Sequence, residues 1–212
     1  MAITFYYGSG SPYAWKVWLV LEHKAIPYDF KLLSFDRGDT KAPAFRALNP
    51  RGTVPTIVDG SLVLWESTAI VEYLEDRYRE RPLMPADPAG RATVRRIMAE
   101  TDSYLAPAVN KLFDATIFSK EPVCAEELGK AQAGLVEELG RFDALLSGEW
   151  LAGSLSLADF AVFSHARLAQ RVDQRQPQKG IGNRMPKRLA GWIKRIEALP
   201  YYEKTVPPHW KS

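Results

Sequence analysis

The chain of 212 residues can form one large or two small domains, and its 46% apolar and 25% charged residues are ordinary for a soluble globular protein. The formal net charge of +3 is too small and too dispersed for a nucleic-acid-binding protein, and no apolar run approaches the about 20 residues of a membrane span. The single Cys124 excludes an internal disulfide, and the three histidines lack metal-ligand spacing. The N-terminus lacks a secretory signal pattern, so we expect a cytoplasmic protein with no metal site.

The first part of the chain predicts a strand, a helix and a second strand. A β-prone run at 3–7 leads through a glycine-rich turn to Ser11 and Pro12, which suit the N-cap and first residue of a helix. The helical pattern continues to about Lys24, and residues 28–33 are again β-prone. Elements of these lengths predict a βαβ unit with parallel strands.

A hairpin follows. Asp59 and Gly60 separate β-prone runs at 56–58 and 62–65, and this dipeptide favours a tight turn because both residues tolerate positive φ. Ser67 then begins a helix whose apolar residues recur at helical spacing: Ile70, Val71, Leu74 and Tyr78.

The hairpin completes a compact first domain, in which a short helix is also expected at 41–47. Residues 1–79 predict an α/β domain with a mixed four-stranded sheet, and the proline-rich segment 80–88 reads as a linker. Residues 89–212 predict an all-helical domain, with helices at 89–118 (bent near Pro107), 121–146, 157–171 and 185–199.

Four motifs carry a resemblance to a known family: SPYAWKV at 11–17, NPRGTVP at 49–55, ESTAIVEYL at 66–74 and SLADF at 156–160. In this order and spacing, over essentially the whole chain, they resemble the soluble glutathione transferases, most of all the serine-type bacterial and plant-like members. The resemblance implies a thioredoxin-like first domain, an all-α second domain, glutathione as cosubstrate and a homodimer.

The resemblance also implies how glutathione is held. The main chain of Val54, ahead of Pro55 in a cis peptide bond, pairs with the cysteinyl part like an added strand. Glu66 meets the γ-glutamyl ammonium, and Ser67 meets the carboxylate at a helix N-terminus. A tight turn and simple helix capping are the structural alternatives at these positions.

Two further residues are implied at the glycine end of the peptide. Lys41 opens the short helix and matches a position that binds the glycine carboxylate in plant-type members, although a solvated surface lysine is an equal alternative. Thr53 stands where those relatives often carry a glutamine, and its shorter side chain weakens that match.

Ser11 is the predicted catalytic residue, because a hydroxyl donor at a helix N-terminus stabilises a thiolate. An unperturbed thiol has a pKa of about 8.5, and lowering it by two units needs about 2.7 kcal/mol. Plain N-capping is the alternative role for Ser11, Ser9 is the nearest substitute, and Tyr6 or Tyr7 would serve in a tyrosine-type enzyme. No cysteine occupies the turn at 8–12, which argues against the cysteine-type branch.

The predicted reaction is attack of the glutathione thiolate on a small apolar electrophile. The alternatives are a non-catalytic ligand-binding module, or an isomerase or peroxidase that uses the same site. Asp159 reads as a capping-box acid and His165 as a core histidine. Candidates to line the second-substrate space are Tyr104, Lys111 and Trp210, and arginines such as Arg96 are expected on solvated faces or dimer contacts.

Overall fold

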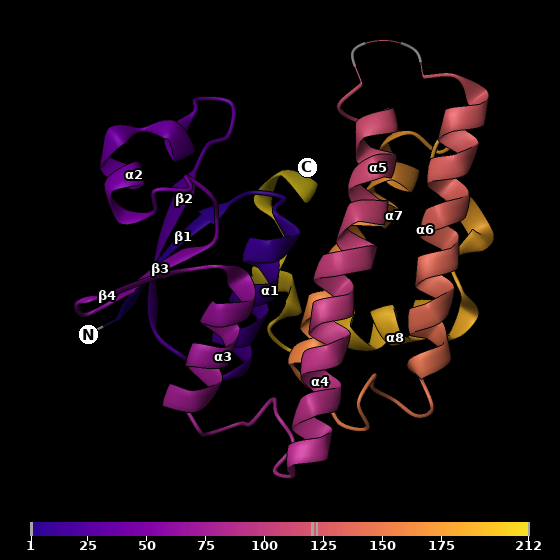
Figure 1. Ribbon diagram of the computed structural model, residues 1–212. Coiled ribbons are helices and arrows are strands. Elements are labelled where there is room, and N and C mark those ends of the chain that lie inside the picture. Colours follow the sequence, from indigo (N-terminus) through magenta and orange to yellow (C-terminus); the bar gives the residue numbers. More distant parts are fainter. Residues whose placement is uncertain (1, 120, 122, 212) are drawn as a thin grey trace. The chain divides into compact units, whose positions relative to one another are not determined.

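The computed structural model describes residues 2–119, 121 and 123–211, which divide into two compact units (Figure 1). One unit comprises the residues up to Leu83 together with those from Pro200 onward, and the other runs from Met84 to Leu199. The predicted limits of 1–79 and 89–212 place the C-terminal tail with the helices, whereas its contacts group it with the first unit. No described helix is long and apolar enough to cross a membrane.

The first unit contains a four-stranded sheet in the order β2-β1-β3-β4. Strands β1 and β2 are parallel, whereas β3 is antiparallel to both β1 and β4. This mixed sheet and the hairpin confirm the prediction. The strands are β1 (Ile3–Gly8), β2 (Tyr28–Leu33), β3 (Thr56–Asp59) and β4 (Leu62–Trp65).

Helices cover both faces of the sheet. The alternation of β1 buries Phe5 and Tyr7 on the side of α1 and α3, while Tyr6 points the other way and its ring lies 5.5 Å from Phe45 of α2. Helix α1 is buried nearly all round, as its apolar density predicts. The helices are α1 (Pro12–His23), α2 (Pro43–Leu48), α3 (Ser67–Arg77) and, in the tail, α9 (Tyr202–Thr205).

The expectation that Lys41 opens the short helix is wrong. Lys41 ends a separate 3-10 turn, Asp39–Lys41, and α2 begins two residues later at Pro43. The reason is local, since a residue before proline is driven to extended geometry and Ala42 has φ −61° and ψ 138°.

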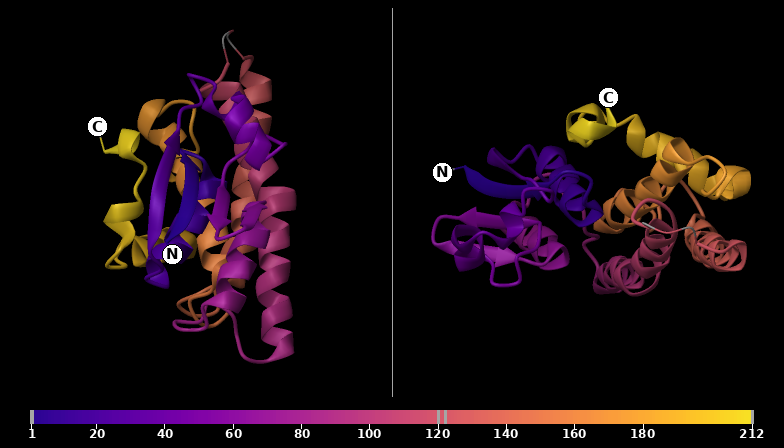
Figure 2. Two further views of the ribbon diagram at one scale, coloured as in Figure 1. Left: turned by 90° about the vertical axis from the view of Figure 1, so that its left-hand side faces the viewer. Right: turned by 90° about the horizontal axis from the view of Figure 1, so that it is seen from above.

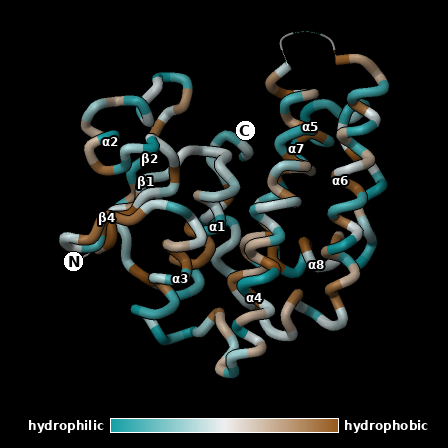
Figure 3. Tube along the Cα trace, viewed as in Figure 1, coloured by the Kyte–Doolittle hydropathy of each residue, from teal (hydrophilic) through white to brown (hydrophobic). Residues whose placement is uncertain are grey.

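The second unit is built from helices, with no named strand among its described residues, and seen from above α4, α5 and α6 lie nearly end-on (Figure 2). Helix α7 is buried over almost all of its first three turns, which confirms its predicted central position. Helix α6 alternates between teal and brown in Figure 3, as an amphipathic helix does, and buries Leu135, Leu139 and Phe142. The helices are α4 (Pro88–Glu100), α5 (Ala106–Thr116), α6 (Ala125–Leu145), α7 (Leu157–Arg175) and α8 (Lys187–Glu197).

Two helix predictions need adjustment. The expected bend near Pro107 is a π-helical turn, Thr101–Leu105, which joins α4 to α5. It lies just before Pro107, whose missing N–H interrupts the regular hydrogen-bond pattern of an α-helix. Helix α6 begins at Ala125 rather than at Glu121, because Glu121 precedes a proline in the sequence and such a residue disfavours helix. Residue 122 of the predicted span 121–146 lies outside the described residues.

Candidate functional site

The predicted site residues of the first unit gather at one end of its sheet. The register pairs Gly8 with Leu33 in parallel, so β1 and β2 end side by side. Thr56 pairs with Tyr6 on one side and with Trp65 on the other, so β3 begins where β1 and β4 end. The segments that carry Ser11, Val54, Glu66 and Lys41 all leave the sheet at this edge, where open α/β sheets bind ligands.

The turn after β1 presents Ser11 at the start of α1. Ser11 is the N-cap, and its Oγ accepts a hydrogen bond from the Ala14 N–H at 3.3 Å, which confirms the predicted cap. A serine hydroxyl that accepts here keeps its own hydrogen to donate elsewhere. Capping and thiolate stabilisation are therefore compatible at Ser11.

The same turn lies against the loop that carries Val54. A Cβ built on Gly8 would approach Val54 Cγ2 to 2.9 Å and the Phe35 ring to 2.4 Å, so any larger residue there would have to displace these side chains. The Val54–Pro55 bond is cis, as expected. Within 2–119, 121 and 123–211 no protein group pairs with the Val54 N–H or C=O, so both main-chain groups are available to a bound peptide.

Sequence reasoning missed the role of Asn49, which organises this loop from inside. The side chain is fully buried, and its Nδ2 donates to the Thr53 carbonyl at 2.9 Å and to Thr56 Oγ1 at 3.0 Å. Its Oδ1 accepts from the Arg51 N–H at 3.0 Å. An asparagine beside a proline is a turn signal that could have drawn attention to it.

Glu66 and Ser67 occupy the start of α3. Glu66 is the N-cap residue with φ +69°, a conformation that costs a non-glycine residue about 1–3 kcal/mol and is concentrated at functional sites. No side chain caps this helix, so among the described residues capping does not explain the pair. Ser67 is the first helical residue and is 6% exposed, beside N–H groups that have no partner within the helix.

The loop that carries Lys41 is tied to the NPRGTVP loop. Gly52 has φ +63°, and a Cβ there would lie 2.6 Å from the Thr40 carbonyl oxygen. Lys41 is exposed and directly follows Thr40, whose carbonyl packs against Gly52 of the NPRGTVP loop. Thr53 is exposed, and its Oγ1 accepts weakly from Asn49 at 3.3 Å, so part of its hydrogen-bonding capacity serves the loop.

The two tyrosines of β1 are poorly suited to activate a thiol. Tyr7 is fully buried, and burial raises its pKa to about 12 against the lowering effect of hydrogen bonds from Gly10 and Ser9. Tyr6 faces α2. Ser9, in contrast, lies in the turn and forms a 2.6 Å hydrogen bond with His209 of the tail, a contact between residues 200 positions apart that the sequence does not signal.

In the helical unit, the residues with a predicted structural role have one. Ser156 and Asp159 form a reciprocal capping box, which confirms the prediction. His165 is fully buried, and its Nδ1 lies 3.1 Å from the Ala161 carbonyl. The exposed Cys124 precedes α6, and no group of three or more metal-ligand side chains occurs among the described residues.

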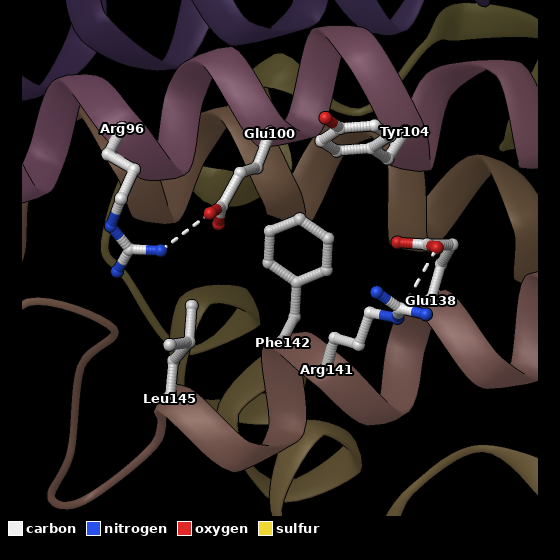
Figure 4. A pocket seen from close by; sticks show the side chains of 7 residues that line it. All are labelled: Arg96, Glu100, Tyr104, Glu138, Arg141, Phe142 and Leu145. Carbon is white, nitrogen blue, oxygen red and sulfur yellow. Dashed lines mark hydrogen bonds and ion pairs between the residues drawn. The ribbon is translucent and has the colours of Figure 1, made fainter.

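Tyr104 lines a groove of about 220 Å³ between the α4–α5 segment and α6 (Figure 4). The side chain is 60% exposed, and Phe142 forms the floor of the groove. Arg96 pairs with Glu100 at 2.6 Å on one wall, and the opposite wall carries Arg141 beside Glu138 at 3.5 Å. Lys111 lies farther along, in an adjoining hollow.

Comparison with known proteins decides the family. Residues 10–77 match the family described as the glutathione S-transferase N-terminal domain. Glutathione S-transferase A of Pleuronectes platessa is 32% identical to this chain, over 98% of the chain and 92% of that protein. The chain belongs to the glutathione S-transferase family.

Solved structures agree with this assignment. A glutathione S-transferase from the Antarctic clam Laternula elliptica is 33% identical, and it superposes with a TM-score of 0.85 over 100% of this chain and 95% of that one. A glutathione transferase from Pseudomonas putida, solved with one glutathione disulfide bound per subunit, is 24% identical with a TM-score of 0.87 over 98% and 91% of the two chains, which supports the fold. The thioredoxin-like domain followed by an all-helical domain is confirmed, and the relatives imply glutathione S-transferase activity.

Proposed function

We propose that this glutathione S-transferase binds glutathione along the edge where β3 begins and activates its thiol with Ser11. The observation that carries the proposal is the meeting, at one end of the sheet, of an unpaired Val54 backbone, an uncapped helix start at Ser67 and the Ser11 hydroxyl. The cysteinyl backbone pairs with Val54, and the γ-glutamyl carboxylate meets Ser67 and the N-terminus of α3.

The remaining contacts complete the peptide. Glu66 is 65% exposed on its side chain, and it offers a carboxylate to the γ-glutamyl ammonium. Lys41, and to a lesser extent Thr53, serve the glycine carboxylate. Pro55 contributes by fixing the direction of the chain at Val54 rather than by touching the ligand.

The chemistry we propose is thioether formation. With the thiol held beside Ser11, its proton leaves to solvent, and the Ser11 O–H donates to the sulfur anion at the N-terminus of α1. The sulfur then attacks an electrophilic carbon of a small apolar compound, which either loses a leaving group or adds the thiolate across a double bond. The protein stabilises the thiolate and holds it in place.

The pKa of the bound thiol tests this proposal. Ultraviolet absorbance of the thiolate against pH should give a pKa well below 8.5 in the wild type. A hydrogen bond to a charged group is worth about 1.5–3 kcal/mol, so Ser11→Gly should raise that pKa by about one to two units. Glycine replaces serine as an N-cap at a cost of only a few tenths of a kcal/mol, so this variant removes the hydroxyl while keeping the helix.

Two outcomes would reject parts of the proposal. If the pKa of the bound thiol is unshifted in the wild type, a non-catalytic binding protein is favoured. If that pKa is lowered in the wild type and equally lowered in Ser11→Gly, the role of donor belongs to another residue such as Ser9. Turnover of a panel of electrophiles and hydroperoxides would then separate conjugation from isomerase or peroxidase activity. We place the protein in the cytoplasm, where its single exposed cysteine stays reduced.

We further propose a homodimer that uses the groove between α4–α5 and α6. An exposed aromatic ring over an apolar floor, flanked by charge pairs, has the composition of an interface core with a polar rim. Light scattering should give twice the chain mass of 23.8 kDa. Tyr104→Glu should shift the protein toward the monomer, whereas Phe118→Glu, at another exposed aromatic of this unit, should not.

A further inference from the structure

The C-terminal tail is anchored along α1 by specific contacts within the first unit. Trp15 Nε1 donates to Thr205 Oγ1 at 3.0 Å, and the Trp210 ring packs edge-on against Trp15 with centroids 5.2 Å apart. Nearer the start of the tail, the Tyr201 hydroxyl lies 2.8 Å from His23 Nδ1. These contacts fix where the last residues of the tail lie.

They bring His209 onto the turn between β1 and α1. His209 Nδ1 lies 2.6 Å from Ser9 Oγ. The imidazole also rests on Gly10, since a Cβ built there would lie 3.0 Å from His209 Cε1. Gly10 has φ +87°, and its N–H donates to the Tyr7 hydroxyl at 3.4 Å. The turn is therefore held by Tyr7 of β1 and by His209 of the tail.

We propose that His209 is a positioning residue for thiol activation, acting through Ser9 and Gly10 on the turn that presents the Ser11 hydroxyl. This inference rests on the proposed function of Ser11. Ser11 is joined to the turn by its N–H, which donates to the Gly8 carbonyl at 3.0 Å, so a displacement of Ser9 and Gly10 displaces Ser11 as well. Because a small misplacement of a catalytic donor costs much of its effect, the contact with His209 matters for turnover more than for folding.

Three substitutions at His209 separate its contributions. Asparagine keeps a hydrogen-bonding atom near the position of Nδ1, phenylalanine keeps the ring on Gly10 without the hydrogen bond, and alanine removes both. Loss of one such hydrogen bond corresponds to about a three- to tenfold change. His209→Phe should therefore lower kcat by about three- to tenfold with KM for glutathione within about twofold, and raise the pKa of the bound thiol. His209→Asn should restore most of the wild-type values.

The partner residue supplies the second measurement. Ser9→Ala should reproduce the effect of His209→Phe, and the double variant should be no worse than either single one, because both remove the same contact. Tyr201→Phe loosens the tail elsewhere, and it should leave kcat and the thiol pKa unchanged. Thermal melts of all variants check that each is folded.

The outcomes distinguish this inference from the proposed function. If Ser11→Gly raises the thiol pKa but His209→Phe and Ser9→Ala leave kcat and that pKa at wild-type values, the role of His209 is overturned and that of Ser11 stands. If His209→Asn loses as much as His209→Phe, the hydrogen bond to Ser9 is not the cause and the inference is also overturned. If Ser11→Gly has no effect on the thiol, both proposals fail.

Discussion

Replacing Asp159 should destabilise the helical unit and leave catalysis intact. Its carboxylate is fully buried and accepts four hydrogen bonds. Oδ1 accepts from the Leu151 N–H at 3.0 Å and from Trp192 Nε1 at 2.9 Å, while Oδ2 accepts from the N–H and hydroxyl of Ser156 at 2.9 and 2.8 Å. The side chain therefore joins the start of α7 to α8 and to the loop before α7.

The cost of Asp159→Ala follows from this set of donors. Each buried donor left without an acceptor costs about 1–3 kcal/mol. Part of this loss is offset, because the variant no longer has to bury a charged carboxylate away from water. We expect a net loss of about 3–5 kcal/mol of unfolding free energy, or about 6–20 °C in Tm for a chain of this length. Ser156→Ala removes one donor and part of the cap, so it should cost only about 0.5–2 kcal/mol.

Circular-dichroism melts and urea titrations measure these losses, and turnover is assayed well below the melting temperature. Asp114→Asn, at an exposed aspartate of α5, is the control and should stay within about 0.5 kcal/mol of wild type. Two results would refute the reasoning. One is an Asp159→Ala variant that melts like the wild type, and the other is a folded variant that has lost turnover, which would make Asp159 a catalytic acid.

Three further predictions concern the first unit. Ser67→Ala should weaken glutathione binding by about 1–3 kcal/mol in calorimetry, the cost of removing a hydrogen bond to a charged group, and unchanged affinity would remove Ser67 from the carboxylate site. Gly52→Ala should raise KM for glutathione at least about tenfold, because its Cβ would meet a backbone oxygen at 2.6 Å, whereas Gly60→Ala, with a similar φ of +61° in open space, should cost only stability of about 1 kcal/mol. Equal effects of the two glycine variants on KM would contradict this account. Burial, followed by nearby positive charges, lowers the pKa of His23 from 6.5 to about 4 in the folded protein, so the unfolded chain binds the extra proton between these values and stability falls as pH drops through this window. At pH 5 the loss should be about 1 kcal/mol after allowance for partial exposure, and urea titrations of His23→Gln at pH 7 and 5 should show that loss disappear.

Several elements of this protein are determined by short-range sequence patterns. Asp59 and Gly60 adopt the hairpin turn because few other residues tolerate its backbone, and Ser11 with Pro12 begins α1 because the two satisfy a helix N-terminus. The capping box at Ser156 and Asp159 is likewise a short-range pattern. Such features depend on residues within a few positions of one another, and the sequence alone sufficed to predict them.

The tertiary structure decided what these elements do together. The start of α2 escaped prediction for a local reason, because Pro43 drives Ala42 to extended geometry and so places the start of the helix beyond Lys41. Asn49 reads as a turn residue in the sequence, and only the folded loop shows that it is buried and hydrogen-bonded to Arg51, Thr53 and Thr56. The contact of His209 with Ser9 spans 200 positions and has no local signature, because it depends on how the tail packs along α1. The sequence by itself therefore determined the family and the two kinds of domain, because both follow from local patterns and motifs. Only the fold set how the turn that holds Ser11 is supported, because that support comes from a residue 200 positions away.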